Sequence, residues 1–349
     1  MKTNFIYPLI LVAFCFLPST FGQGALTPPG APAPEMKTLA QIEPRTPISS
    51  APFTITNSGS YYLTTNLTVS SGNAITIATN GVTLDLGGFT IASTAPSAAG
   101  AGIWLTSSLR NLAIFNGFIR SGVTNNGSGV YGGAGFQDGI NYQSVFNGHT
   151  YVGFPVNARV HGVSVFGCLG NGIYLSNGDS TTVEFCTAQT IGGSGIVAAV
   201  VKQCVALDCG SAGIYGDVVA DCEGQSYAGA AVDGNIVKDC YGTSITGMGI
   251  SANAAENCYG TSSSNYGVSA NTAMFCYGNS VSYVGLYAFY LATSCCGQSG
   301  SVSQMGLYAL NAAFCTAIVA SGTAIEATVA NGCYASSGTN LITYKYNMP

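Results

Sequence analysis

Through the second half of the chain, apolar residues return at fixed positions of an eighteen-residue repeat. From Cys168 to Cys276 six successive steps between cysteines are each 18 residues long, and the same step separates Cys315 from Cys333. Ten residues after the cysteine stands the aliphatic column Ile196, Ile214, Val232, Ile250, Val268, Leu286 and Ile325. Three residues before it stand Val183, Val201, Val219, Val237, Ala255 and Ala273. Such columns indicate a structural repeat.

The repeat predicts an all-β fold, a right-handed, single-stranded parallel β-helix with about 18 residues per coil. Each column then occupies one place in every coil, at the strand spacing of about 4.8 Å. Cysteine and the aliphatic residues are expected to face inward. Five residues before the cysteine stand Asp217, Asn235, Asn253 and Asn271. This column predicts a ladder of side-chain amide hydrogen bonds at a turn.

Two other solenoids also have short coils. A left-handed hexapeptide helix has about 18 residues per coil, but it needs an aliphatic residue every six. Six residues after the cysteine this chain has small or polar residues, namely Gly210, Ala228, Thr246, Ser264 and Ser282. A calcium-binding nonapeptide roll requires repeated GGxGxD, which the sequence lacks. A right-handed helix with strands of unequal length agrees with the right-handed rule for parallel crossovers.

The front half alternates in the manner of β-strands without keeping one coil length. Residues 74–91 and 102–119 alternate apolar and polar positions and end at glycine-containing corners. The stretch 121–157 is irregular and is expected to leave the coil as a long loop, where sites tend to lie on a rigid scaffold. We therefore expect irregular coils and a long loop over 53–180, and regular 18-residue coils over 181–349.

The chain begins with the features of a secretory signal peptide. Lys2 precedes an apolar run from Phe5 to Leu17, and small residues follow near Gly22, so residues 1–22 are expected to be removed on export. A membrane anchor, the alternative, needs a longer apolar run of about 20 residues. No later stretch is expected to span a membrane. The mature protein is therefore predicted to be secreted, extracellular or at the cell surface.

Residues 23–52 are rich in proline and are predicted to form a linker and N-terminal cap. The amphipathic piece from Met36 to Glu43 would be a short helix over the first coil, because an open β-helix end exposes apolar core and unpaired backbone. A flexible spacer is the alternative.

The composition excludes one class of partner and raises a question about the thiols. Charged residues make up 7% of the chain and the formal net charge is −5, so no basic surface for nucleic acid is expected. Secreted proteins oxidise their cysteines, which makes disulfides between stacked coils one alternative. Stacked Cβ atoms point the same way and lie slightly too far apart, which favours free, inward thiols acting as small hydrophobic groups.

Three segments carry a resemblance to a known family: GSYYLTTNLTV at 59–69, LDLGGFTI at 84–91 and the closing KYNMP. Over nearly the whole mature chain the sequence resembles secreted bacterial right-handed β-helix proteins, pectate-lyase-like in fold and largely uncharacterised in function. The resemblance implies the fold, and it raises polysaccharide lyase or hydrolase chemistry as an alternative.

The chemistry that this resemblance would imply is not visible as motifs. Pectate-lyase-like enzymes bind calcium with clustered Asp and use Arg or Lys as a base, and polygalacturonases use NTD, DD, GHG and RIK. Neither set is present, and the nearest fragment is VHG at 160–162. The catalytic candidates that remain are Asp138, His149, Arg159, His161 and Asp179. The alternative is that these charges only keep an apolar rod soluble.

Asp221 and Asp239 share the column just before the cysteine and are the candidate metal site. Their carboxylates are expected to stack within about 5 Å and to repel each other unless something screens them. A calcium ion would do so. Solvent, or pairing with Lys202 and Lys238, is the alternative. No other cofactor is expected.

Tyr241, Tyr259 and Tyr277 directly follow the cysteine and are the candidate substrate-binding residues. A row of outward tyrosines would stack on sugar rings. The alternative is that the rings stabilise the sheet as cross-strand pairs.

The sequence therefore predicts a non-enzymatic, secreted β-helix protein. It would be a structural component of a surface or matrix, or a polysaccharide-binding module. The alternative is a lyase or glycoside hydrolase that acts on a uronate-containing polysaccharide near the 121–157 loop. Fold analogy supports that alternative, and the absence of catalytic motifs argues against it.

Overall fold

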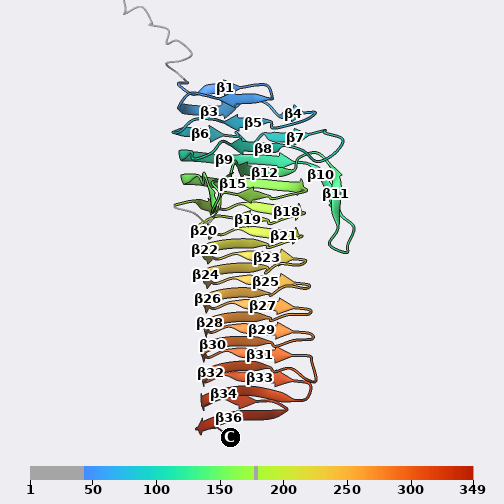
Figure 1. The fold of residues 1–349 in the computed structure, drawn as a ribbon, viewed down its shortest axis with the longest axis vertical. Helices are drawn as coiled ribbons and strands as arrows, with labels where there is room; N and C mark the ends of the chain where they lie inside the picture. Colours follow the sequence, from blue (N-terminus) through green and yellow to red (C-terminus); the bar gives the residue numbers. More distant parts are fainter. Residues whose placement is uncertain (1–42, 177–179, 349) are drawn as a thin grey trace, which may run out of the picture. The chain divides into compact units, whose positions relative to one another are not determined.

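The computed structural model describes residues 43–176 and 180–348, nearly all within the compact unit Arg45–Pro349. The predicted signal peptide, the predicted helix up to Ile42 and Asp179 lie outside the described residues. Within those residues the chain forms strands and turns but no helix, so none that could cross a bilayer. Thirty-two strands belong to one sheet, and every pairing in it is parallel, with residues one coil away. The unit is a parallel β-helix (Figure 1), as predicted.

The strands form three parallel stacks, one for each side of the coil. The first stack runs through the front half and contains β2 (Phe53–Ile55), β5 (Ile75–Ile77), β8 (Ala101–Leu105), β12 (Asp138–Tyr142), β16 (Ile173–Tyr174) and β19 (Ile196–Val197). The second contains β1 (Thr46–Ile48), β3 (Gly59–Leu63), β6 (Val82–Asp85), β9 (Arg110–Arg120), β15 (Val156–Cys168), β17 (Thr182–Glu184) and β20 (Val200–Lys202).

The third stack holds the strand that follows each cysteine corner. It contains β4 (Leu67–Val69), β7 (Thr90–Ser93), the ends of β9 and β15, β18 (Thr187–Ile191), β21 (Val205–Cys209), β23 (Glu223–Ser226), β25 (Tyr241–Ser244), β27 (Tyr259–Ser262), β29 (Tyr277–Ser280), β31 (Cys296–Ser299), β33 (Thr316–Val319) and β35 (Tyr334–Ala335).

In the regular coils the first and second stacks merge into one longer strand. Both β19 and β20 pair with β22. The merged strands are β22 (Ile214–Ala220), β24 (Val232–Lys238), β26 (Ile250–Glu256), β28 (Val268–Met274), β30 (Leu286–Thr293), β32 (Leu307–Ala313), β34 (Thr323–Asn331) and β36 (Thr339–Tyr346).

The strand register gives the coil length directly. Val183 pairs with Val201 and Val201 with Val219, which confirms steps of 18 residues. In the front half Ile75 pairs with Ile103 and Ile103 with Ile140, which are steps of 28 and 37 residues (103 − 75 and 140 − 103). The front coils are therefore irregular, as the sequence indicates.

The regular coils are thinner than the front coils. The front core is filled by large aliphatic side chains such as Ile103 and Leu105, both fully buried. In the regular coils a Cβ on Gly242 would lie 2.2 Å from the carbonyl oxygen of Gly249, and one on Gly260 would lie 2.1 Å from that of Gly267. Opposite walls of the coil approach so closely at these positions that only glycine fits.

Two boundaries differ from the sequence prediction. The stretch 121–157 is not one long loop, because β12 in its middle returns to the first stack. Around it lie two antiparallel hairpins, β10 (Gly122–Asn125) with β11 (Tyr131–Ala134) and β13 (Val145–Phe146) with β14 (Tyr151–Val152). At the N-terminus, β1 falls inside the predicted linker 23–52 and already pairs with β3. Short strands flanked by Gly and Pro are too brief to show as periodicity.

Candidate functional site

Each coil turns sharply at the residue just before the cysteine. Asp221, Asp239, Asn257 and Phe275 all have a positive φ there, between 51° and 55°. Asp and Asn tolerate this left-handed conformation better than most residues, which explains the acidic and amide side chains of the column. Phe275 adopts it too and is exposed. The column that the sequence suggested as a metal site is first of all a corner.

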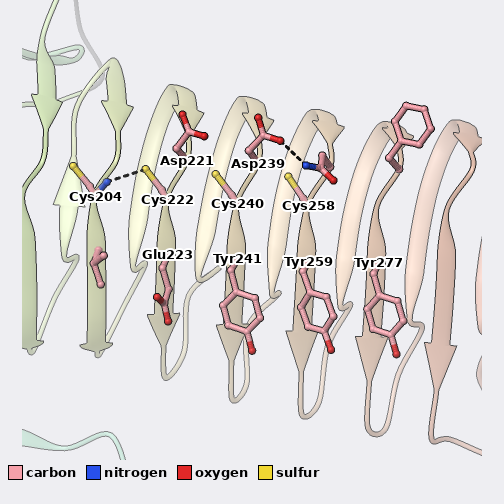
Figure 2. A pocket seen from close by; sticks show the side chains of 13 residues that line it. Cys204, Asp221, Cys222, Glu223, Asp239, Cys240, Tyr241, Cys258, Tyr259 and Tyr277 are labelled. Atoms are coloured by element: carbon pink, nitrogen blue, oxygen red, sulfur yellow. Dashed lines mark hydrogen bonds between the residues drawn. The ribbon is translucent and has the colours of Figure 1, made fainter.

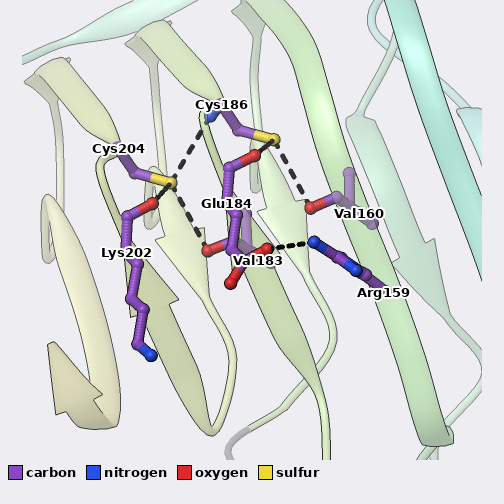
Figure 3. Close-up of polar contacts among 7 residues, drawn as sticks. All are labelled: Arg159, Val160, Val183, Glu184, Cys186, Lys202 and Cys204. Carbon is purple, nitrogen blue, oxygen red and sulfur yellow. Dashed lines mark hydrogen bonds and ion pairs between the residues drawn. The ribbon is translucent and has the colours of Figure 1, made fainter. Parts of the chain in front are cut away.

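The cysteines satisfy the backbone at this corner. The thiol of Cys222 donates to the carbonyl of Ala220 at 3.0 Å, and its Sγ accepts from the backbone N–H of Cys204 at 3.5 Å. Cys204 repeats the pattern toward Lys202 and Cys186, as Figure 3 shows. All twelve described cysteines are free, and eleven are buried, which confirms the predicted column of inward thiols. Their role as hydrogen-bonding groups was not predicted.

Burial keeps these thiols protonated. It raises the pKa of Cys209, and the nearby Asp208 carboxylate raises it further. It also raises the pKa of Cys168. A buried thiol has no solvent to stabilise its thiolate, so these groups are poor nucleophiles.

Two outward columns flank the cysteines and enclose a groove that crosses successive coils (Figure 2). One wall carries the corner residues Asp221, Asp239, Asn257 and Phe275. The other wall carries Glu223, Tyr241, Tyr259 and Tyr277 from the starts of β23, β25, β27 and β29. The cavity measures about 650 Å³. We call it the tyrosine groove; it joins the predicted substrate-binding and metal candidates in one place.

The tyrosines stack on one another rather than presenting open ring faces. Ring centroids are 5.2 Å apart between Tyr241 and Tyr259 and 4.7 Å apart between Tyr259 and Tyr277, with interplanar angles of 16° and 11°. This is the cross-strand arrangement that stabilises a sheet. The hydroxyl groups all extend in the same direction (Figure 2), and that of Tyr277 donates to Gln298. The groups that a ligand would meet are therefore phenol edges and hydroxyls.

Asp221 and Asp239 point to the same side of the corner column (Figure 2). Oδ1 of Asp239 accepts a hydrogen bond from Nδ2 of Asn257 at 2.6 Å. Lys238 pairs with Glu256 at 3.2 Å, so its cation is shared with another carboxylate. Over 43–176 and 180–348 no group of three or more His, Cys, Asp or Glu could hold a metal ion. Calcium at this pair stays a prediction that rests on two carboxylates.

The asparagine ladder is confirmed. Asn235 donates to Asp217 at 3.0 Å, Asn253 to Asn235 at 2.8 Å and Asn271 to Asn253 at 3.0 Å. Each amide in the middle of the row both donates and accepts, so the column fixes the register of four coils.

A second ladder, of inward serines, was missed. Oγ of Ser262 donates to the carbonyl of Gly247 at 2.7 Å, and Oγ of Ser280 donates to that of Asn265 at 2.6 Å. Both serines are buried. The repeated segments YGTS, YGTS and YGNS at 241–244, 259–262 and 277–280 were the signal that could have shown it.

The structure does not bring the catalytic candidates of the front half together. Arg159 forms an ion pair with Glu184 at 2.5 Å (Figure 3), and His161, two residues along β15, lies edge-on to Phe185. His149 is exposed in the turn between β13 and β14. The remaining described candidate, Asp138, is in β12.

Asp138 lines a separate cleft of about 630 Å³, together with Trp104, Tyr142, Phe154 and Tyr174. We call it the aromatic cleft. It lies on the first stack, beside the β13–β14 hairpin that precedes β15. The sequence placed a site near this stretch but did not identify its aromatic residues.

Comparison of the chain with protein-family models, with curated proteins and with solved structures found no match. Its function is therefore inferred from the geometry above.

Proposed function

We propose that the protein is a secreted, non-enzymatic, right-handed β-helix of pectate-lyase-like type that binds a neutral polysaccharide along the tyrosine groove. The observation that carries the proposal is the repetition of the groove walls. One wall offers Tyr241, Tyr259 and Tyr277 in succession, and the other offers Asp221, Asp239 and Asn257.

A repeating groove suits a repeating ligand. Successive coils are spaced by about 4.8 Å, so the same phenol hydroxyl and the same carboxylate or amide recur along the axis. These groups donate and accept hydrogen bonds, which is what the many hydroxyls of a glycan require. A compact small molecule would use only one repeat of the wall. A chain laid across the coils uses several, and the weak contacts add.

The charge of the groove favours a neutral chain over a uronate. Asp221, Glu223 and Asp239 all line it, and none of its described lining residues is Lys or Arg. A polyuronate would bring its carboxylates against these three, and like charges repel without a screening cation. This argues against the alternative of a uronate-specific lyase at this site.

Affinity electrophoresis in gels containing xylan, mannan, hydroxyethyl cellulose or polygalacturonate tests the proposal. We expect at least one neutral polymer to retard the protein and Tyr259→Ala to weaken that binding about tenfold, equivalent to about 1.4 kcal/mol. Tyr334→Ala is the matched control, because Tyr334 occupies the same column but does not line the groove.

Two results would contradict the proposal. One is retardation by polygalacturonate alone. The other is the appearance of unsaturated products, detected by ultraviolet absorbance, when the protein is incubated with a uronate polysaccharide, which would establish a lyase instead.

A further inference from the structure

The aromatic cleft is built by residues from coils that are far apart in sequence. Asn141 pairs with Trp104 across β12 and β8, and Ile140 pairs with Ile173, which places Tyr174 beside Asn141 in the next coil. Trp104, Asn141 and Tyr174 therefore follow one another along one column of the first stack. Phe154, from the segment after the β13–β14 hairpin, closes the side of the cleft.

Its aromatic residues are arranged differently from the tyrosine stack. Tyr142 is 5% exposed and forms a fixed base, stacked on Tyr174 at 5.8 Å and edge-on to Phe154 at 5.9 Å. Among the described residues, Trp104 has no ring contact with another aromatic side chain. Its indole is half-buried and lines the cavity. It is thus the one large ring of the cleft that is left for a ligand to stack on.

Polar groups lie around this aromatic base and are held in place. Asp138 is 9% exposed, and its Oδ1 accepts from the backbone N–H of Asn171 at 2.7 Å and from Nδ2 of Asn171 at 3.3 Å. Oδ1 of Asn141 accepts from the backbone N–H of Tyr142 at 2.8 Å, so the donor it can offer a ligand is Nδ2. Gln143 also lines the cleft.

This combination matches the two sides of a sugar ring. A pyranose has an apolar face that packs on an aromatic ring and a rim of hydroxyls that needs donors and acceptors. The volume of about 630 Å³ falls among ordinary small-molecule sites, of about 300–1,000 Å³. No Lys or Arg is among the described lining residues, so nothing there would pair with a uronate carboxylate.

The cleft lacks the groups for glycoside hydrolysis. Most glycosidases use two carboxyl groups on opposite sides of the scissile bond. Asp138 is the single carboxylate among the described residues that line the cleft, and Asn171 already holds it. Binding without cleavage is therefore the chemistry that the cleft supports.

We infer that the aromatic cleft is a second carbohydrate site, which takes one or two neutral pyranose units, with Trp104 as the stacking platform and Asn141 as a hydrogen-bond donor. The site lies on the first stack of the front coils, whereas the tyrosine groove follows the third stack of the regular coils. The inference does not rest on the function proposed for that groove.

Trp104 is the only tryptophan in the chain, so its fluorescence reports on this cleft alone. We would titrate the full-length protein with the β-1,4-linked tetrasaccharides of glucose, mannose and xylose, and with tetragalacturonic acid. We expect a saturable change in Trp104 emission with at least one neutral probe. Tyr174→Ala and Asn141→Ala should each raise the Kd at least tenfold. Tyr259→Ala, in the tyrosine groove, should leave it unchanged.

Three outcomes would overturn the inference: no saturable change with any neutral probe, preference for tetragalacturonic acid, or a Kd that neither Tyr174→Ala nor Asn141→Ala alters. Circular dichroism and the melting temperature of each variant establish that it is folded. Asn141→Ala serves as the milder variant, because Asn141 is half-buried and its substitution leaves the ring packing of Tyr142 and Tyr174 in place. Polymer binding through the groove is measured separately, so loss of one site is distinguishable from loss of the other.

Discussion

The hydroxyl of Tyr131 donates to Oδ1 of Asp208 at 2.9 Å, across 77 residues of sequence. Nδ2 of Asn125 donates to the same oxygen at 2.6 Å. Asn125 ends β10 and Tyr131 begins β11, so one carboxylate of the regular coils holds both strands of this hairpin. Burial of the phenol, and then its bond to Asp208, raise the pKa of Tyr131. The hairpin is thereby fixed against a coil formed much later in the chain.

Replacement of Asp208 should release this hairpin without unfolding the helix. Asp208→Ala removes the acceptor of two hydrogen bonds to a charged group, and we expect a loss of on the order of 1–3 kcal/mol in local stability. Hydrogen exchange should become faster over 122–134 and stay slow in β25 and β27. Glu223→Ala, at an exposed carboxylate, is the control. Unchanged protection of 122–134 in Asp208→Ala would mean that other contacts hold the hairpin.

Gly260→Ala should be strongly destabilising. The added Cβ would lie 2.1 Å from the carbonyl oxygen of Gly267, and backbone on both walls would have to move. We expect a loss of about 3 kcal/mol or more, measured by chemical denaturation. Gly132→Ala is the matched control, since a Cβ there meets nothing within 4 Å and its φ is not in the left-handed region. Equal midpoints for the two variants would refute the thin-coil interpretation.

Cys222→Ala should destabilise the helix by more than the loss of a small apolar group. The variant removes the acceptor for the backbone N–H of Cys204 and the donor to the carbonyl of Ala220. A buried unpaired N–H costs about 1–3 kcal/mol. Cys296→Ala is the control, because Cys296 is half-buried and lies outside the corner column. If both variants lose the same stability in urea, the thiol has no hydrogen-bonding role.

Asp233 should make the protein less stable at neutral pH than its amide variant. Burial raises the pKa of Asp233, although bonds from Ser251 and the backbone of Gly234 oppose this. A folded pKa above the unfolded one favours folding below the unfolded pKa, and this contribution is lost as pH rises through the folded pKa. Asp233→Asn should therefore raise the melting temperature at about pH 7 and change it little at about pH 3. A gain of equal size at both pH values would contradict this explanation, and Glu223→Gln is the surface control.

The sequence predicted the regular coils because a solenoid turns sequence period into spatial contact. Residues 18 apart, such as Asn235 and Asn253, are hydrogen-bonded neighbours in the structure. The inward cysteines followed from the same reasoning. Their bonds to the corner backbone did not, because the left-handed φ at Asp221 or Asn257 is not visible in a pattern of apolar residues.

The front half could not be treated in the same way. The steps that join Trp104 to Asn141 and Asn141 to Tyr174 are 37 and 33 residues (141 − 104 and 174 − 141), so no single period reveals them as neighbours. The candidates Asp138, His149, Arg159 and His161 were selected by residue type, and the structure places them on separate strands and a turn.

By itself, the sequence determined that the regular coils repeat every 18 residues, that their thiols face inward and that amide side chains form a ladder at one turn. A fixed period leaves only one way to stack identical coils, so pattern and packing coincide there. The tertiary structure alone decided how unequal coils align and where the hairpins fold back. Those contacts depend on register between segments of different length, and through that register Asp208 meets Tyr131 and Trp104 meets Asn141.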